Sequence, residues 1–344
     1  MMTTLSADDR LSPDAITGAA VAALRAHGAS AEQAIPLAAA IAAAERDGIR
    51  SHGLMYLPIY CEHLTCGKVI GTAVPTVTRA KAASVTVDAG NGFAHAAIAA
   101  GLPVLVEAAR EVGLAGMAVR RSYNCGILGY HVEAIAAAGF VGLGFTNAPA
   151  SIAPAGGRKP VVGTNPWALA VPDGAGGALF VIDQSASVVA KSEVVKRAKA
   201  GEPIPEGWAF DAQGLPTTDA AEALKGTMVP SGGYKGVGAA VLTEVFAACL
   251  AGATLGKDAS PFSGPVGGPP ATGQFFFAID PAATSGGVFG DRIVALAEAL
   301  GAETGGRLPG ARKKAARARH DAEGIAVDAG LRATLHRLAK GPTA

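Results

Sequence analysis

The sequence predicts an α/β protein, and three observations lead to that fold class. Between about residues 83 and 183, short apolar segments alternate with longer helical ones, as expected for strands and helices layered on a buried sheet. The first 70 or so residues instead show helix-start signals and no strand pattern. Half of the 344 residues are hydrophobic and 17% are charged. That composition suits packed cores, and the length suggests about two domains.

Three helices are expected in the N-terminal segment. Ser12-Pro13 marks the start of the first helix, because Ser can cap and Pro fits the first helical position. Ser30 begins a capping box for the second helix, which runs toward Arg46. The third helix is expected over residues 54–66. Ser51-His52 therefore falls in the joint between two helices, where a side chain can point into a cleft.

The central region is expected to hold the sheet. Strands are predicted over residues 83–88, 114–120, 140–147, 179–183 and 275–280, with helices over 94–112 and 129–138. Later helices are predicted over residues 291–300 and 329–338, and a buried helix in the apolar window 237–255. The most loop-like segment is 261–273, and a loop of this length is usually functional or mobile. A lid and an inter-subunit arm are both compatible with it.

Composition also excludes several classes of function. The net charge of +1 gives no electrostatic basis for binding nucleic acid or an anionic membrane surface. The four cysteines show no CxxC and no Cys/His metal spacing, so no metal is expected. No signal peptide is visible, which predicts a cytoplasmic protein. The apolar window 237–255 contains Glu244 and is better interpreted as a buried helix than as a membrane span.

The tripeptide Ser51-His52-Gly53 is the first candidate for chemistry. Imidazole is the side chain whose unperturbed pKa lets it exchange a proton near neutrality. The Ser51 hydroxyl can orient His52, and Gly53 removes bulk so that a substrate can approach. A His between small residues is also commonly structural.

A second candidate is the Gly-rich segment Gly232-Gly233-Tyr234-Lys235-Gly236. It precedes a helix and carries a Lys, and backbone N–H groups at such a start can bind a phosphate. An ordinary Gly-rich turn with a surface Lys is the alternative. A Rossmann fingerprint is rejected, because Gly142-Leu143-Gly144 lacks a third Gly at the required spacing.

Together with Ser51-His52-Gly53, five further segments occur in an order that resembles the malate/L-lactate dehydrogenase family of NAD(P)-dependent oxidoreductases. The segments are Gly92-Phe93-Ala94-His95, Ser122-Tyr123-Asn124-Cys125-Gly126, Gly163-Thr164-Asn165-Pro166, Pro216-Thr217-Thr218-Asp219 and Gly232-Gly233-Tyr234-Lys235-Gly236. The family includes sulfolactate, ureidoglycolate and diketogulonate enzymes and Δ1-piperideine-2-carboxylate reductases. The resemblance runs from about residue 14 to about residue 325.

The resemblance implies a fold and an assembly. It implies a mixed-sheet, non-Rossmann NAD(P)-binding domain, a helical domain built from both ends of the chain, and a homodimer. The corresponding boundaries are an N-terminal helical segment at 1–74, a cofactor-binding domain at 75–290 with the loop 261–273, and C-terminal helices at 291–344 that return to the N-terminal segment.

The resemblance also implies catalytic roles. His52 corresponds to the proton donor in reduction and Ser51 to its hydrogen-bonding neighbour. Glu193 aligns with a carboxylate that completes a relay in relatives similar to the piperideine-carboxylate reductases. A surface charge beside Lys196 is the alternative for Glu193.

For the substrate, the resemblance implicates Thr164, Lys191 and Ser192. Many relatives carry Arg where this chain has Tyr56, and such an Arg can pair bidentately with a carboxylate. Arg50, or Arg46 one turn earlier, is the candidate replacement.

Many relatives also carry His where this chain has Asn124, which cannot exchange protons at neutral pH. The replacement of that His by Asn124 leaves His52 as the acid.

Cofactor contacts, with either NAD or NADP, are implied at a larger set of positions. They are Asn124, Cys125, Gly126, Ile127, Leu128, Asp183, Gln184, Ser185, Tyr234, Lys235, Arg307, Gly310 and Arg312. The basic run at residues 312–320 is interpreted as a solvated helix face or as a phosphate contact. A 2′-phosphate of NADP would need cations, for which Arg120-Arg121 or Arg312-Lys313 are candidates.

These observations predict a reductase that uses NAD(P)H to interconvert a small 2-oxo acid and a 2-hydroxy acid. Reduction of a cyclic 2-imino acid (Δ1-piperideine- or Δ1-pyrroline-2-carboxylate) is the first alternative. A catalytically silent binding protein on the same scaffold is the second, motivated by Tyr56 and Asn124, and the intact Ser51-His52 pair argues against it.

Overall fold

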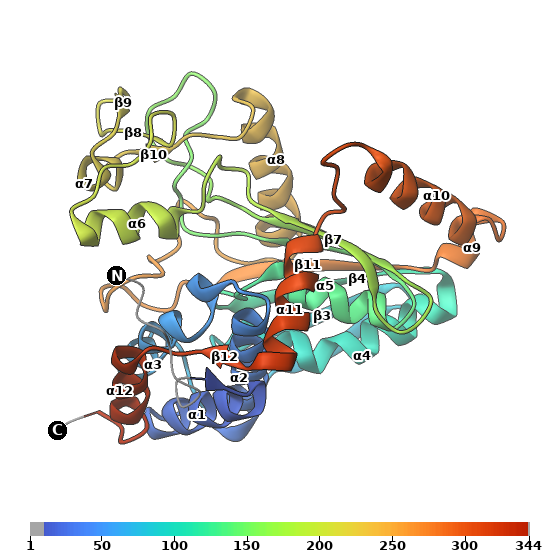
Figure 1. Cartoon of the computed structure of the whole chain (residues 1–344), viewed down its shortest axis with the longest axis horizontal. Helices are drawn as coiled ribbons and strands as arrows, with labels where there is room; N and C mark the ends of the chain where they lie inside the picture. The colour runs from blue at the N-terminus through green and yellow to red at the C-terminus, as the bar shows by residue number, and fades with distance from the viewer. Residues whose placement is uncertain (1–9, 343–344) are drawn as a thin grey trace.

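A seven-stranded mixed sheet forms the centre of the computed structural model, which describes residues 10–342 (Figure 1). Only β3 and β4 pair in parallel; every other neighbouring pair in this sheet is antiparallel. In spatial order the strands are β2 (Thr76–Lys81), β3 (Ser84–Asp88), β4 (Leu114–Ser122), β11 (Thr272–Ile279), β5 (Val141–Thr146), β6 (Trp167–Pro172) and β7 (Ala178–Gln184). The predicted mixed-sheet α/β fold is confirmed.

Helices α4 (Ala94–Val112) and α5 (Leu128–Ala137) cover one face of the sheet. Alternate strand residues point to that face, so their apolar side chains form the main core with the two helices. Buried members of this core include Val85, Val87, Met117, Val119 and Phe276.

The N-terminal segment folds into three helices, as predicted. They are α1 (Pro13–Ala26), α2 (Ala31–Arg46) and α3 (Leu57–Thr65). Ser12 and Ser30 cap α1 and α2, accepting hydrogen bonds from the N–H groups of Ala15 at 3.1 Å and Gln33 at 3.3 Å. Two short 3₁₀ turns, η2 (Arg50–His52) and η3 (Leu54–Tyr56), form the joint between α2 and α3.

The end of the chain returns to these helices. The returning elements are α11 (Ala311–Glu323), β12 (Ile325–Ala326) and α12 (Ala329–Leu338), and β12 pairs antiparallel with β1 (Arg10–Leu11). Leu335 and Leu338 of α12 share a core with Ile16 and Leu24 of α1. The outermost residues of the predicted segments 1–74 and 291–344 lie outside the described residues, and the division into these segments stays a prediction.

The helix predicted over 291–300 does not join the N-terminal helices, so this part of the expected packing is wrong. It is α10 (Phe289–Ala302), which follows the short α9 (Pro281–Ser285) and stands on the far side of the sheet from α4 (Figure 1). Only Ala297 of α10 is buried. The helix forms because its sequence is strongly helical, and its apolar residues stay largely uncovered.

A smaller lobe, which sequence periodicity did not reveal, lies beside the sheet. Its core contains Ile152, Val194, Ala209 and Met228. Its elements are α6 (Lys191–Ala200), α7 (Ala220–Ala223) and a three-stranded sheet of β8 (Ala209–Phe210), β9 (Pro216–Thr217) and β10 (Thr227–Met228). Two-residue strands are too short to show an alternating pattern in the sequence.

The apolar window 237–255 is helical only in part. The prediction that this helix is buried is wrong for one of its faces, which is exposed. Helix α8 (Tyr234–Glu244) continues as a π-helix, η4 (Val245–Leu250). Val241, Leu242, Val245 and Leu250 are 42–59% exposed. Within residues 10–342, no helix is long and apolar enough to cross a membrane.

Candidate active site

His52 lies in η2, in the joint between α2 and α3, and is half-buried. The Oγ atom of Ser51 is 3.1 Å from Nδ1 of His52. Within residues 10–342, Nε2 of His52 has no hydrogen-bond partner, which leaves this nitrogen for a ligand. Desolvation by burial lowers the pKa of His52 from its ordinary value. The imidazole is therefore mainly neutral at pH 7.

The joint is held by a buried carboxylate that sequence reasoning missed. Oε1 of Glu45 accepts a hydrogen bond from the N–H of Leu54 at 2.8 Å. A Cβ atom on Gly53 would lie 2.2 Å from this oxygen. Gly53 thus makes room for Glu45, which corrects its interpretation as space for a substrate. A Glu in the last turn of a helix is too common a residue to signal this role.

Arg50 lies on the exposed side of the same joint. Its Nη2 donates a hydrogen bond to the carbonyl oxygen of Ala326 in β12 at 3.0 Å. The guanidinium has further N–H groups that could bind an anion. Arg46, the other cationic candidate, pairs with Asp321 of α11, with Nε 2.6 Å from Oδ1.

Tyr56 connects three parts of the chain. Its hydroxyl donates to the carbonyl oxygen of Phe262 at 3.0 Å, and Nδ2 of Asn124 lies 3.5 Å from the same hydroxyl oxygen. Oδ1 of Asn124 accepts from the N–H of Gly126 at 2.6 Å, which fixes the turn that leads into α5. Burial raises the pKa of Tyr56, so the phenol stays protonated.

Three of the four segments predicted to contact the cofactor meet at one end of the sheet. The N–H of Gly129, just after the 124–128 turn, donates to Oδ2 of Asp183 in β7 at 2.7 Å. The N–H of Val181 donates to the carbonyl oxygen of Pro309 at 3.4 Å, which places the 307–310 segment against the same strand. Gln184 and Ser185 continue from Asp183 at this end of β7.

Within the 124–128 turn, Cys125 and Leu128 face inward and Ile127 is half-buried. The carbonyl oxygen of Cys125 accepts from Nε2 of His131 at 2.9 Å, and burial raises the pKa of its thiol to about 12. These side chains support the turn, so any cofactor contact there falls to the backbone.

The fourth segment, at the start of α8, is exposed. Gly232 and Gly233 have φ angles of 71° and 65°, a left-handed conformation that favours glycine. Tyr234 is 72% exposed, and Lys235 has no polar partner within residues 10–342. An exposed phenol, a free ammonium and the first N–H groups of a helix together suit an anionic, partly aromatic ligand.

Helix α6 carries three of the remaining predicted site residues at its start. The side chain of Lys191 is exposed, and desolvation by the surrounding protein lowers its pKa. Ser192 follows it, and Glu193 lies 4.0 Å from Lys196 and is partly exposed. The lysine next to Glu193 fits the surface-charge alternative as well as a relay.

Thr164 lies on the turn before β6, where its carbonyl oxygen accepts from the N–H of Ala186 at 2.8 Å. The next residue, Asn165, has a φ of 38° and donates through Nδ2 to Oε2 of Glu244 at 2.6 Å. Glu244 also accepts from the N–H of Gly256 at 2.6 Å. This buried network holds Thr164 in place and explains the one carboxylate in the apolar window.

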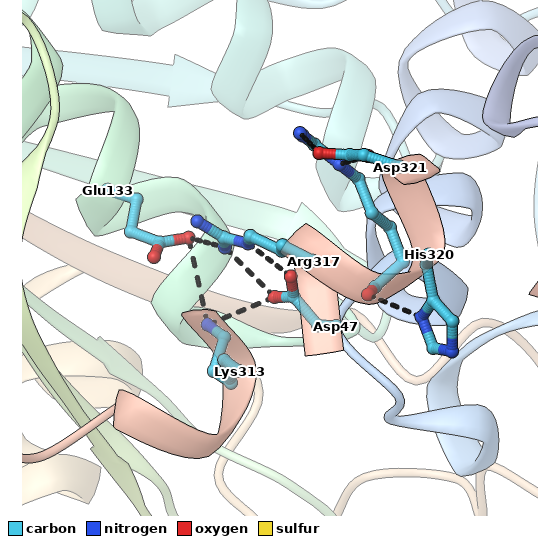
Figure 2. A network of polar contacts seen from close by, with 7 residues as sticks. Asp47, Glu133, Lys313, Arg317, His320 and Asp321 are labelled. Atoms are coloured by element: carbon cyan, nitrogen blue, oxygen red, sulfur yellow. Dashed lines mark hydrogen bonds and ion pairs between the residues drawn. The ribbon is translucent and has the colours of Figure 1, made fainter. Parts of the chain in front are cut away.

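Two residues of the basic run at 312–320 are neither solvated nor free to bind a phosphate. Lys313 and Arg317 of α11 form ion pairs with Asp47 and Glu133, which we call the clasp (Figure 2). Nζ of Lys313 lies 3.2 Å from Asp47, and Nη2 of Arg317 lies 2.6 Å from Glu133. Arg312 is exposed and has no ion-pair partner within residues 10–342.

The other proposed cations for a 2′-phosphate are also paired. Arg120 and Arg121 both contact the carboxylate of Asp88, at 3.3 and 2.8 Å. His63 of α3 and His131 of α5 are buried and hydrogen-bonded. Among residues 10–342, no group of three or more His, Cys, Asp or Glu side chains is placed to hold a metal ion.

Comparison with known proteins gives consistent matches over nearly the whole chain. A family model described as malate/L-lactate dehydrogenase matches residues 11–336. The chain is 44% identical over 298 residues to (2R)-3-sulfolactate dehydrogenase (NADP(+)) of Chromohalobacter salexigens, covering 87% of this chain and 89% of that protein. It is 38% identical to Δ1-pyrroline-2-carboxylate reductase of Ancylobacter novellus, covering 92% and 93%.

Solved structures show the same architecture. The Δ1-piperideine-2-carboxylate reductase from Pseudomonas syringae superposes with a TM-score of 0.90 at 36% identity, covering 96% of this chain and 99% of that one. The sulfolactate dehydrogenase from Methanocaldococcus jannaschii gives a TM-score of 0.85 at 26% identity, covering 96% of each chain.

Proposed function

Because the chain belongs to the malate/L-lactate dehydrogenase family, we propose that it interconverts a small 2-oxo acid and a 2-hydroxy acid as an NAD(P)-dependent oxidoreductase. The observation that carries this proposal is the Ser51–His52 pair, held on the Glu45-supported joint with Nε2 of His52 unengaged. Reduction of a cyclic 2-imino acid is the second candidate, supported by relatives named as pyrroline- and piperideine-2-carboxylate reductases.

The cofactor, when bound, supplies the hydride. The residues proposed to hold it are the 124–128 turn, Asp183 to Ser185, Tyr234-Lys235, and Arg307, Gly310 and Arg312. Lys235, Arg307 and Arg312 are the cations of this set, none has an ion-pair partner within residues 10–342, and they would face its phosphates. NADP is the favoured form, because the sulfolactate dehydrogenase relative is named for NADP(+).

The protein's own part is to bind the acid and manage one proton. Reduction leaves negative charge on the oxygen or nitrogen that was the acceptor, and His52 donates the proton that neutralises it. Ser51 at Nδ1 fixes the ring so that Nε2 faces the acceptor. Glu193 is proposed to complete a proton relay with the Ser51–His52 pair.

The carboxylate of the substrate needs a cationic partner other than the Arg found in many relatives. Lys191 is proposed to help, because its side chain is exposed at the start of α6 and has no acidic partner within residues 10–342. Arg50 is proposed as the second cation. Thr164, Ser192 and Tyr56 line the same site.

Oxidation of NADPH and of NADH tests the function. The substrates are pyruvate, 3-sulfopyruvate, Δ1-pyrroline-2-carboxylate and Δ1-piperideine-2-carboxylate, and a substrate-dependent loss of absorbance is expected with at least one of them. A protein that binds NADPH but oxidises it with none of the panel would instead support the silent-scaffold alternative.

We also propose a homodimer, formed through the sheet face opposite α4 and α5. That face carries Phe275 and Phe277, whose rings lie 5.5 and 5.6 Å from Phe246 of η4. Two helices with uncovered apolar residues, α8–η4 and α10, stand on the same side of the sheet (Figure 1). Exposed apolar surface on this scale is characteristic of an interface, and a second copy of the chain presents the matching surface.

Sedimentation velocity tests the dimer. The wild-type protein is expected to sediment as a dimer and Leu242→Asp as a monomer, because the substitution would place a carboxylate in an apolar interface. Val74→Asp, at an exposed apolar residue before β2, is the control and should remain a dimer. A wild-type monomer at micromolar concentration would overturn the proposal.

Finally, a cytoplasmic location is proposed. All four cysteines are free thiols, the state maintained in a reducing compartment.

A further inference from the structure

The first part of the predicted loop, residues 261–264, is fastened to the N-terminal helices by three side chains. Nζ of Lys68 donates to the carbonyl oxygen of Pro261 at 2.7 Å. The hydroxyl of Tyr56 donates to the carbonyl oxygen of Phe262 at 3.0 Å, and Nε2 of His63 lies 3.1 Å from the carbonyl oxygen of Gly264. Three of the four backbone carbonyls of residues 261–264 are thus hydrogen-bonded to side chains of the N-terminal segment. We call residues 261–264 the tethered segment.

The three tethering side chains include polar groups whose burial costs free energy. Lys68 is 1% exposed, and a buried ammonium is costly unless it is hydrogen-bonded. His63 is fully buried, and its second ring nitrogen contacts the hydroxyl of Tyr123. By contrast, Val266 in the same loop is 80% exposed. The loop is therefore fixed in its first part and open in its second.

The tethered segment also lies next to residues of the proposed active site. The ring of Phe262 is centred 5.3 Å from that of Tyr123, the residue before Asn124. Tyr56 touches both Phe262 and Asn124 through one hydroxyl. Phe262 therefore lies beside the residues proposed for substrate and cofactor, while its backbone cannot retreat without breaking hydrogen bonds.

We propose that the tethered segment is a fixed wall of the substrate site, and that Phe262 sets the largest side chain the 2-oxo or 2-imino acid can carry. This inference rests on the proposed function. The wall limits the substrate to acids with a small group beside the reacting carbon. Tyr56 acts as a positioning residue for the wall, since its only O–H donates to Phe262 and is not available to a carboxylate.

The ratio of kcat/KM for phenylpyruvate to kcat/KM for pyruvate measures the wall. Phe262→Ala should raise this ratio by about 10-fold or more, because pocket space of even one methylene changes discrimination on that scale. Val266→Ala is the matched control in the same loop and should leave the ratio unchanged. Tyr56→Phe should raise the ratio by a smaller factor, through KM more than kcat.

Binding without turnover gives a second readout. Calorimetric titration with oxamate and N-phenyloxamate should show that Phe262→Ala gains affinity for the larger ligand only. Melting temperature checks that each variant is folded, and Phe262→Leu replaces Phe262→Ala if the latter is not.

If folded Phe262→Ala showed the wild-type ratio of kcat/KM values and the wild-type affinity for N-phenyloxamate, the proposal that Phe262 limits the substrate would be overturned. A wild-type protein inactive on every acid but selective in the titration would instead reject the proposed function alone.

Discussion

At the scale of single residues, the surroundings of His52 bear on its proposed role as the proton donor. Ser51 engages Nδ1 of His52, and Asn124, which cannot exchange a proton at neutral pH, follows the nearby Tyr123. Among the residues of the proposed site, His52 carries the group whose ordinary pKa lies nearest neutrality, so it is the expected acid. His52→Ala should therefore lower kcat by about 10²-fold or more, the usual scale of a lost general acid. Stopped-flow turnover measures this effect.

The dissociation constant of NADPH, from fluorescence titration, should stay the same in His52→Ala. If this variant turned over near the wild-type rate, His52 would not be in the mechanism.

The pH dependence of the reaction follows from the burial of His52. Desolvation lowers its pKa below the ordinary value of 6.5, so the protonated donor is a minority form at pH 7. Reduction needs that form, and kcat/KM for reduction should fall as pH rises through the lowered pKa. Oxidation of the 2-hydroxy acid needs neutral His52, so kcat/KM for oxidation should rise over the same pH interval. A reductive profile that rises with pH between 5 and 7 would contradict this assignment.

Single residues were predictable where residue type alone carries the chemistry. A His beside a Ser and an Asn in place of His are visible in the sequence. The partners of Glu45, Lys68 and His63 were not predictable, because each is buried against a segment that the chain reaches only after folding. Burial turns common polar residues into tethers, and no local pattern records it.

At the scale of elements, the start of α8 is the place where a phosphate would meet a free cation. Lys235→Ala should weaken NADPH binding by about 10-fold, a loss of about 1.4 kcal/mol as for one charge-assisted hydrogen bond, with a smaller effect on kcat. Lys257→Ala is the control, because Lys257 is exposed and pairs with Asp258 at 2.8 Å. Equal dissociation constants for wild type and Lys235→Ala, by calorimetry, would assign this lysine to the surface.

The elements themselves were predicted well wherever one face is buried. The helix expected over residues 94–112 is α4, with the same bounds, because its apolar stripe packs against strands on one side only. The apolar window 237–255 failed as a buried helix, since hydrophobicity does not distinguish a core from an uncovered surface. The lobe at 191–228 escaped notice because its strands have two residues each.

At the scale of the whole molecule, the clasp joins three regions far apart in the sequence (Figure 2). Asp47 follows α2, Glu133 lies on α5, and Lys313 and Arg317 lie on α11. It thus ties the segment before His52 to the helix after the 124–128 turn. Charges separated by so many residues give no signal in the sequence, where the run at 312–320 resembles a solvated helix face.

Breaking the clasp should cost more stability than breaking an exposed pair between the same helices. Arg317→Met leaves Asp47 and Glu133 with Lys313 alone, and should lower the free energy of unfolding by about 2–3 kcal/mol. Arg46→Met removes the pair with Asp321, whose side chains are both 42% exposed, and should cost about 0–1 kcal/mol. Urea denaturation followed by circular dichroism gives both values, and equal midpoints for the two variants would refute the difference.

The pairing of β1 with β12 has a consequence for how the protein is made. The core of α1, α2 and α3 includes Ile325, Val327, Leu335 and Leu338, which the ribosome adds only after all seven strands of the central sheet. At about 5–20 residues per second, the helices that bear His52 wait tens of seconds for these side chains, with apolar surface open to other nascent chains. The core around the joint can therefore close only late in synthesis, and until then the N-terminal helices are expected to bind chaperones.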